Sequence, residues 1–265
     1  MNAASILGLA LLLAACSKAE SAPADPPAPP PIPAAPAPTT KAFLHKEKSD
    51  LIELEYGYSA EAAAVPALVE QFAAELKTIR AELIEPATSD RDFRQKEGHP
   101  FNPYTSETDY ETAGQSASLL SLEREHSSFT GGAHPNHGTS ALIWDRKAGK
   151  EVGSADLFAA AQNRERLLTQ PWCDALNAER EKKRGAPVSG NEMFDECPKL
   201  DDIAIIPVDK DSNGRFERLE MVASPYVAGP YVEGSYEIEL AVTADLLAGF
   251  KEAYRPDFEI MPSAQ

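Results

Sequence analysis

The sequence predicts an α+β fold: a mainly antiparallel sheet with helices packed on one face. Segments in which apolar and polar residues alternate mostly follow one another along the chain. Apolar stripes with helical spacing occur only at irregular intervals, which do not fit a repeated strand-helix-strand unit. Strands that follow strands favour antiparallel pairing, so we expect few parallel neighbours.

The first residues predict a lipoprotein signal. Residues 1–15 hold an apolar run too short to span a bilayer, followed by small residues directly before Cys16. The ending Leu13-Ala14-Ala15-Cys16 resembles a bacterial lipobox, which implies cleavage before Cys16 and acyl chains on it. The alternative is an ordinary secretory peptide with a chance cysteine. We expect a lipid-anchored protein of the cell envelope, and Ser17 favours the outer membrane, facing the periplasm.

A tether and two modules are predicted after the signal. Residues 16–40 are dominated by proline and alanine beyond Cys16, which predicts an extended linker without a core. We expect an amino-terminal strand-helix module over 41–112 and a carboxy-terminal module over 113–265. The formal net charge of −17 disfavours nucleic acid as a partner and favours cationic ones.

The amino-terminal module begins with a strand and a helix. Residues 52–58 alternate as a half-buried strand does. A stripe of apolar residues from Val65 to Leu83 predicts a helix that starts at Pro66. The polar stretch 88–118 predicts loops, with one exposed strand around 105–112.

The carboxy-terminal module is expected to hold most of the strands. Strands are predicted from Leu120 to Phe129, around 141–144, and over 203–208, 216–222 and 236–242. A helical region from Asp156 to about Arg184 is expected to break near Pro171. Thr243 is expected to cap a final helix, whose apolar residues are Leu246, Leu247, Phe250 and Tyr254.

Two cysteines remain once Cys16 is lipidated. Cys173 and Cys197 form an even pair, which predicts a disulfide in an oxidising compartment. The alternative is a pair of free, buried thiols.

The stretch TGGAHPNHG has the residue types of a metal or proton-transfer site. His134 and His137, with His126 or Glu125 on the preceding strand, could supply three ligands. However, Pro135 and the two glycines exclude the helix in which histidines at this spacing share a face. The candidate binding residues of this rigid loop, which is otherwise only a tight turn, are Gly131, Gly132, Ala133, His134, Pro135 and His137.

The stretch DKDSNGRFERLE matches the spacing of a calcium-binding loop. Its candidate ligands are Asp209, Asp211, Asn213 and Glu220, with Gly214 at the sixth position. The preceding residues predict a strand where such a loop needs a helix, and a hairpin turn explains the same residues without a ligand. We therefore predict neither a metal nor a cofactor, and retain these residues as the calcium candidate.

The stretch PYVAGPYVEG repeats Pro-Tyr-Val-x-Gly. Proline and glycine make a stiff loop, and tyrosine faces can stack on sugars or dock a protein. The alternative is a wide turn whose tyrosines pack on the sheet. The candidate binding residues are Tyr226, Gly229, Pro230, Tyr231 and Gly234.

A resemblance to a known family is carried by four parts of the sequence. They are TGGAHPNHG, the Cys197-Pro198 region, PYVAGPYVEG and a terminal segment YRPDF. The chain resembles the paired domains of unknown function in the extracytoplasmic part of RsiV, a lysozyme-sensing anti-sigma factor, and in the non-catalytic part of the peptidoglycan deacetylase PdaC. The likeness covers about residues 51–258, and it is more specific in the carboxy-terminal module. It implies an α+β envelope module that binds and does not catalyse.

The expected function is therefore that of a non-enzymatic envelope lipoprotein with a ligand-binding domain. Peptidoglycan and a lysozyme-like protein are the two candidate ligands, and the membrane is a partner through the lipid anchor. Two alternatives stay open: a metal-assisted cell-wall hydrolase that uses His126, His134 and His137, and a structural envelope protein.

Overall fold

The computed structural model describes residues 41–190 and 193–261. The predicted signal peptide over 1–15, the lipidation residue Cys16 and the linker over 16–40 lie outside this range. No helix of the described part combines the length and apolar character needed to cross a bilayer.

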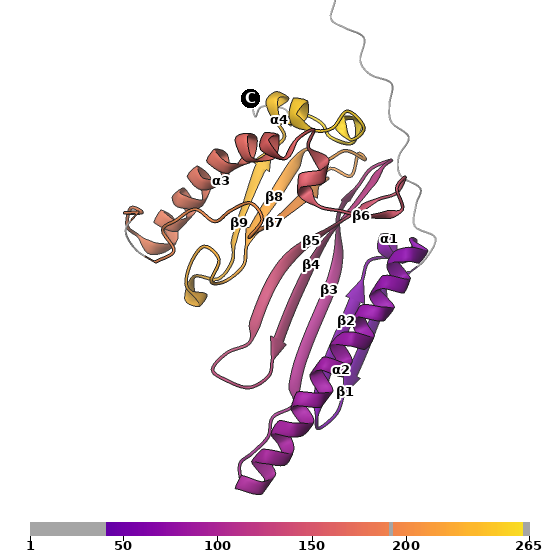
Figure 1. Ribbon diagram of the computed structural model, residues 1–265, viewed down its shortest axis with the longest axis vertical. Helices are drawn as coiled ribbons and strands as arrows, with labels where there is room; N and C mark the ends of the chain where they lie inside the picture. The colour runs from indigo at the N-terminus through magenta and orange to yellow at the C-terminus, as the bar shows by residue number, and fades with distance from the viewer. Residues whose placement is uncertain (1–40, 191–192, 262–265) are drawn as a thin grey trace, which may run out of the picture. The chain divides into compact units, whose positions relative to one another are not determined.

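The first sheet has six strands in chain order (Figure 1). Neighbours pair antiparallel except β2 and β3, which are parallel and joined through two helices. The predicted α+β class with a mainly antiparallel sheet is thus confirmed, with one strand-helix-strand crossover within it. The elements are β1 (Phe43–Lys48), β2 (Ile52–Tyr58), α1 (Ala60–Ala63), α2 (Pro66–Glu97), β3 (Tyr104–Gln115), β4 (Leu119–Phe129), β5 (Asn136–Asp145) and β6 (Lys150–Val152).

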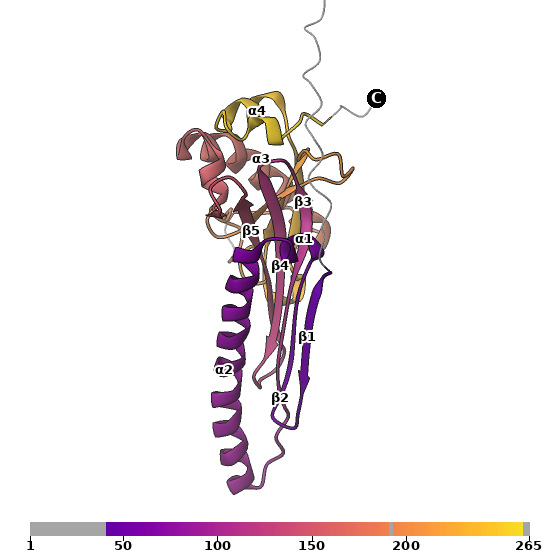
Figure 2. The ribbon, with the colours of Figure 1, turned by 90° about the vertical axis from the view of Figure 1, so that its right-hand side faces the viewer.

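Helix α2 covers one face of this sheet (Figure 2). Its stripe residues Leu68, Phe72 and Leu83 are buried against the sheet. Side chains alternate along a strand, so every second residue of β2 and β3, such as Tyr56 and Tyr110, faces the helix. The residues between them point to the opposite face.

The loops predicted over 88–97 are wrong, because α2 continues to Glu97. Its second half is polar but rich in helix-forming residues, and the Arg94 Nε to Asp90 Oδ2 pair of 2.7 Å spans one turn. The helix ends at Gly98, whose φ of +73° suits glycine. Strand β3 is also longer and less exposed than predicted, since it lies between β2 and β4.

The second sheet is antiparallel and lies between α3 and the first sheet. Leu168, Trp172 and Leu176 of α3 pack against Leu219 and Met221 of the second sheet. Its elements are β7 (Ala204–Val208), β8 (Arg218–Ala223) and β9 (Tyr236–Ala241), covered by α3 (Ala161–Arg184). The remaining elements are α4 (Ala244–Gly249) and three 3-10 helices, η1 (Ser154–Leu157), η2 (Tyr231–Glu233) and η3 (Arg255–Asp257).

The other face of the second sheet packs on the open face of the first. Ile206 and Val208 of β7 contact Ala113 of β3 and Ala141 of β5. The backbone N–H of Asp209 donates to the carbonyl of Ala113 at 3.1 Å, which links the end of β7 to β3. The module boundary predicted between 112 and 113 falls inside β3, at a position where the sheet is continuous.

Two helix predictions need correction. Helix α3 runs unbroken through Pro171, because buried Leu168, Trp172 and Leu176 on both sides of it hold the helix by tertiary packing. Thr243 caps the last helix as predicted, its hydroxyl accepting from the Leu246 N–H. That helix ends at Gly249, however, so Phe250 and Tyr254 lie beyond it.

Candidate functional site

The glycine-histidine loop connects β4 to β5. Gly131 and Gly132 have φ values of +93° and +103°, a backbone region that glycine adopts at little cost, so the sequence requires glycine here for conformation. Strand β5 begins at Asn136, which places His137 on the strand and His134 in the loop. The loop is therefore a hairpin connection and not a helix, as its proline and glycines predict.

The proline-tyrosine loop connects β8 to β9. Tyr226 has a φ of +71°, which is strained for a bulky residue, and its N–H donates to the Gly229 carbonyl at 2.9 Å. A side chain at Gly229 would collide with Glu233 and with the Tyr236 ring, at 2.9 Å from Cε2. Gly234, with a φ of +68°, ends the turn that carries Tyr231.

The two loops meet. The rings of His134 and Tyr231 stack at 3.8 Å between centroids with an interplanar angle of 21°, and the Tyr231 hydroxyl donates to the Pro135 carbonyl at 2.8 Å. Tyr226 and His137 lie at 5.8 and 5.6 Å from the same ring. We call His134, His137, Tyr226 and Tyr231 the aromatic platform. Tyr226 is 54% exposed, so part of the platform faces solvent.

The platform rests on the strands beneath it. The Thr139 N–H donates to the Ser224 hydroxyl at 3.0 Å, which ties β5 to the start of the proline-tyrosine loop. A side chain at Gly138 would lie 2.8 Å from His126 Cε1.

The three histidines near the platform do not make a metal site. The pKa of His126 is lowered mainly by burial and further by the nearby positive charge of Arg124. Within the described residues, His126, His134 and His137 do not form a group with metal-ligand spacing.

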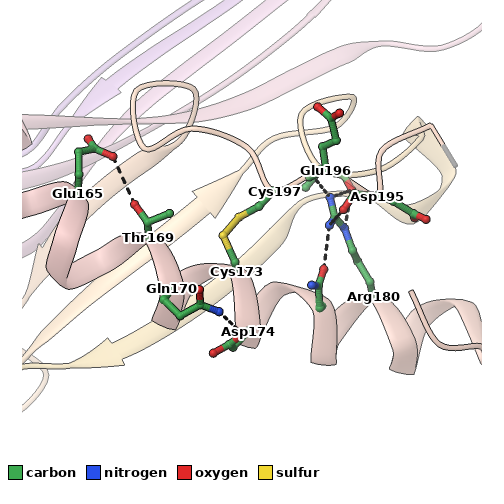
Figure 3. Close-up of a disulfide and its surroundings, with 11 residues drawn as sticks. Glu165, Thr169, Gln170, Cys173, Asp174, Arg180, Asp195, Glu196 and Cys197 are labelled. Carbon is green, nitrogen blue, oxygen red and sulfur yellow. Dashed lines mark hydrogen bonds between the residues drawn. A yellow bond between two sulfur atoms is a disulfide. The ribbon is translucent and has the colours of Figure 1, made fainter. Parts of the chain in front are cut away.

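The buried Arg180 binds the proline-tyrosine loop, and it lies on the same helix as the disulfide (Figure 3). Arg180 of α3 donates to the Ala228 carbonyl at 2.8 and 3.0 Å, and to the carbonyls of Asp195 and Glu196 at 3.0 Å each. The predicted bond between Cys173 and Cys197 is present and joins α3 to the same segment. The sequence contains no pattern that identifies Arg180, since a helical arginine is usually solvent-exposed.

Carboxylates cover the face of the first sheet opposite α2. Register places Glu55 beside Glu107, Asp109 beside Glu125, and Glu111 beside Glu123. Like charges directly opposite each other destabilise a sheet, so this arrangement calls for a functional reason. We call the set the acidic face; its members are Glu53, Glu55, Glu107, Asp109, Glu111, Glu123 and Glu125.

The charge of the acidic face is only partly neutralised. On β2, Lys46 pairs with Glu55 and Lys48 with Glu53, each at 2.7 Å. In the part of the chain that the structure describes, no basic side chain lies within ion-pair distance of the five acidic residues on β3 and β4. Burial, followed by the nearby carboxylates of Glu220, Glu125, Glu237 and Glu111, raises the pKa of Glu123 to about 7.

Two hollows lie along the acidic face, and the second of them reaches the platform. The larger, about 810 Å³, is lined by Glu55, Glu107, Asp109 and Glu111 among others. The second, about 380 Å³, shares Glu107 and Asp109 with it and extends to His137. The platform and the acidic face therefore border one continuous surface, which sequence reasoning missed because it depends on strand register.

The calcium candidate is a loop between β7 and β8. Asp209 and Asp211 lie together, and Glu217 joins them, so that one carboxylate oxygen of each lies within 4.8 Å of the others. Glu220 is not part of this group: it lies within β8, three residues on from Glu217, so its side chain points to the other face of the strand. Asn213 stays in the loop, its backbone N–H bonded to Asp209 and Asp211.

Comparison with known families confirms the resemblance stated above. Residues 45–137 match a family model described as Deacetylase PdaC. This match extends past residue 112 to include β3, β4 and the glycine-histidine loop.

Solved structures of two DUF3298-family proteins are also similar to this chain. The protein from Bacteroides fragilis is 14% identical, with 82% of this chain and 95% of that chain covered and a TM-score of 0.47. The protein from Pseudomonas aeruginosa is 15% identical, with 80% and 94% covered and a TM-score of 0.43. Comparison with curated proteins gives no significant match.

Proposed function

We propose that this chain is a non-enzymatic, lipid-anchored envelope protein that binds a cationic, lysozyme-like protein through the aromatic platform and the acidic face. The observation that carries the proposal is the continuity of the two: His137 belongs to the platform and lines the hollow that also holds Glu107, Asp109 and Glu125. Anchoring aromatic side chains and complementary charge are the usual components of a protein-binding surface.

Each component has a separate task in this proposal. The platform supplies rigid aromatic area, because its rings are fixed by stacking and by the Tyr231 to Pro135 hydrogen bond. Rigid anchors lose little conformational entropy on binding, so they contribute most of the affinity. The acidic face attracts a positively charged partner and accelerates its approach.

The proposal is tested by measuring lysozyme binding to the immobilised full chain. We expect Tyr231→Ala to weaken binding about tenfold or more, as for a central aromatic contact. Phe93→Ala is the matched control, since Phe93 is 61% exposed but lies on α2, which covers the opposite face of the sheet. We expect that variant to bind as the wild type does.

The acidic face is tested through the association rate. We expect Glu107→Gln with Asp109→Asn to slow association roughly threefold to tenfold and to flatten its dependence on salt. Glu82→Gln with Glu85→Gln removes the same charge from the exposed side of α2 and should leave both unchanged.

Peptidoglycan provides the contrasting outcome. Isolated sacculi are incubated with the full chain under the same conditions, because tyrosine faces can also stack on sugars. The proposal is contradicted if the chain is retained on sacculi but does not bind lysozyme. It is also contradicted if neither Tyr231→Ala nor the acidic-face variant changes lysozyme binding.

A further inference from the structure

The loop between β7 and β8 brings three carboxylates to one point. Asp209, Asp211 and Glu217 each place an oxygen within 4.8 Å of the other two. Asp209 and Glu217 are only 9% and 7% exposed, while Asp211 is exposed at the mouth of the loop. Three negative charges at this separation repel one another strongly unless a cation lies between them.

A second observation also indicates that this loop binds a ligand. The Oε2 atom of Glu217 is buried and has no hydrogen-bond partner. The other oxygen of Glu217 accepts from the Lys210 N–H at 3.2 Å, and Arg218 Nε lies beyond hydrogen-bond distance of it, at 3.6 Å. A buried carboxylate oxygen without a partner costs free energy, and a bound cation would remove this cost.

Arg218 Nε lies within ion-pair distance of Glu217 Oε1, at 3.6 Å, but among the residues that the structure describes no basic side chain pairs with Asp209 or Asp211. The ammonium group of Lys210 is directed to Glu239 of β9, and Arg218 also pairs with Glu239, at 2.7 Å. Asp209 is held in place by the N–H groups of Asn213 and Gly214, at 3.1 and 2.9 Å.

We infer that this loop binds a calcium ion, with Asp209, Asp211 and Glu217 as its carboxylate ligands. All three ligands are hard oxygen donors, the chemistry that calcium prefers. The sequence spacing pointed to Glu220, at the twelfth position. The fold instead supplies Glu217, at the ninth, because Glu220 faces the opposite side of β8.

Calorimetric titration of the EDTA-treated full chain with calcium chloride tests this site. We expect one saturable event with a dissociation constant of about 10⁻⁴ M, as in extracellular calcium modules, and weaker binding of magnesium. Glu217→Gln should weaken calcium binding by about tenfold or more. Asp211→Asn should do the same without unfolding the chain, because Asp211 is exposed.

Glu220→Gln is the matched control on the same strand. It makes the same chemical change three positions away and should leave calcium affinity within about twofold of the wild type. The inference is overturned if calcium gives no saturable heat, if magnesium binds more tightly, if Glu217→Gln and Asp211→Asn both bind as the wild type, or if Glu220→Gln abolishes binding.

Discussion

Arg180 is fully buried, and its guanidinium donates hydrogen bonds to backbone carbonyls and not to a carboxylate. Its planar, multiply donating head suits this task, because several carbonyls can be satisfied from one side chain. One residue of α3 thus fixes both the segment around Glu196 and the proline-tyrosine loop at Ala228.

Arg180→Met should lower the free energy of unfolding by about 3 kcal/mol or more, because buried carbonyls lose their donor. Urea denaturation measures this change. Arg166→Met is the control, since Arg166 is exposed on the same helix, and its effect should stay within about 0.5 kcal/mol. Equal effects of the two substitutions would contradict the role given to Arg180.

Glu123 should make stability depend on pH. Its pKa of about 7 in the folded protein exceeds the value of 4.5 expected in the unfolded chain. Between pH 4.5 and 7, Glu123 is protonated in the folded protein but ionised in the unfolded chain. The contribution of Glu123 to the free energy of unfolding is therefore fully present below about pH 4.5 and is lost as the pH rises through 7.

Glu123→Gln should therefore match the wild type near pH 4.5 and exceed it at pH 8, by about 1 kcal/mol after allowance for solvent screening. Urea denaturation at several pH values checks this. Glu82→Gln on the exposed side of α2 is the control. A wild-type and Glu123→Gln pair whose difference does not change with pH would refute the assignment.

At the scale of elements, the disulfide joins α3 to a segment with little regular structure. Residues 185–203 contain no helix or strand in the positions that the structure describes, and they connect α3 to β7. Cys197 lies in this segment and is bonded to Cys173 of α3, 24 residues earlier in the sequence. The bond reduces the freedom of the unfolded chain over that loop.

Replacing both cysteines by alanine should cost about 3 kcal/mol of stability. Urea denaturation of the oxidised wild type and of the double variant measures the difference. Reductant should destabilise the wild type by a similar amount and leave the variant unchanged. A reductant effect of equal size on both would show that the disulfide is not its cause.

Element boundaries were predictable where local signals are strong. Pro66 and Thr243 marked helix starts correctly, because both act within one turn. The second half of α2 was not predictable, because its polar helix-forming residues give no apolar stripe. The continuation of α3 through Pro171 was not predictable either, because long-range packing holds the helix there.

At the scale of the molecule, the packing of the two sheets depends on one glycine. A side chain at Gly114 would lie 2.7 Å from the Asp209 nitrogen and 2.9 Å from Phe216 Cε1. Backbone cannot yield as a flexible side chain does, so the second sheet would have to move away from β3.

Gly114→Ala should therefore destabilise the protein by about 1–3 kcal/mol, as overpacking does. Thermal unfolding of the full chain measures it. Gly153→Ala is the matched control, because an added carbon there meets only Asp156 Oδ2, at 3.6 Å. A control variant that is as unstable as Gly114→Ala would point to glycine loss in general and not to the contact between sheets.

Only the part of the site that depends on short stretches of sequence was predictable. The residue types of both loops marked His134 and Tyr231 as candidates, yet only the fold shows that they stack. The acidic face depends on the register of three strands, and Glu217 on which side of β8 it occupies. Neither is encoded in a short stretch of sequence.

The chain order of the first sheet affects how it can assemble. Each strand from β2 to β6 pairs with the strand that precedes it in the chain, and β8 and β9 do the same in the second sheet. No strand has to be inserted between two that are already paired, so a chain that emerges amino terminus first can extend each sheet at its growing edge. Each sheet can thus grow in one direction along the chain, with its first strand and its most recent strand as the two edges.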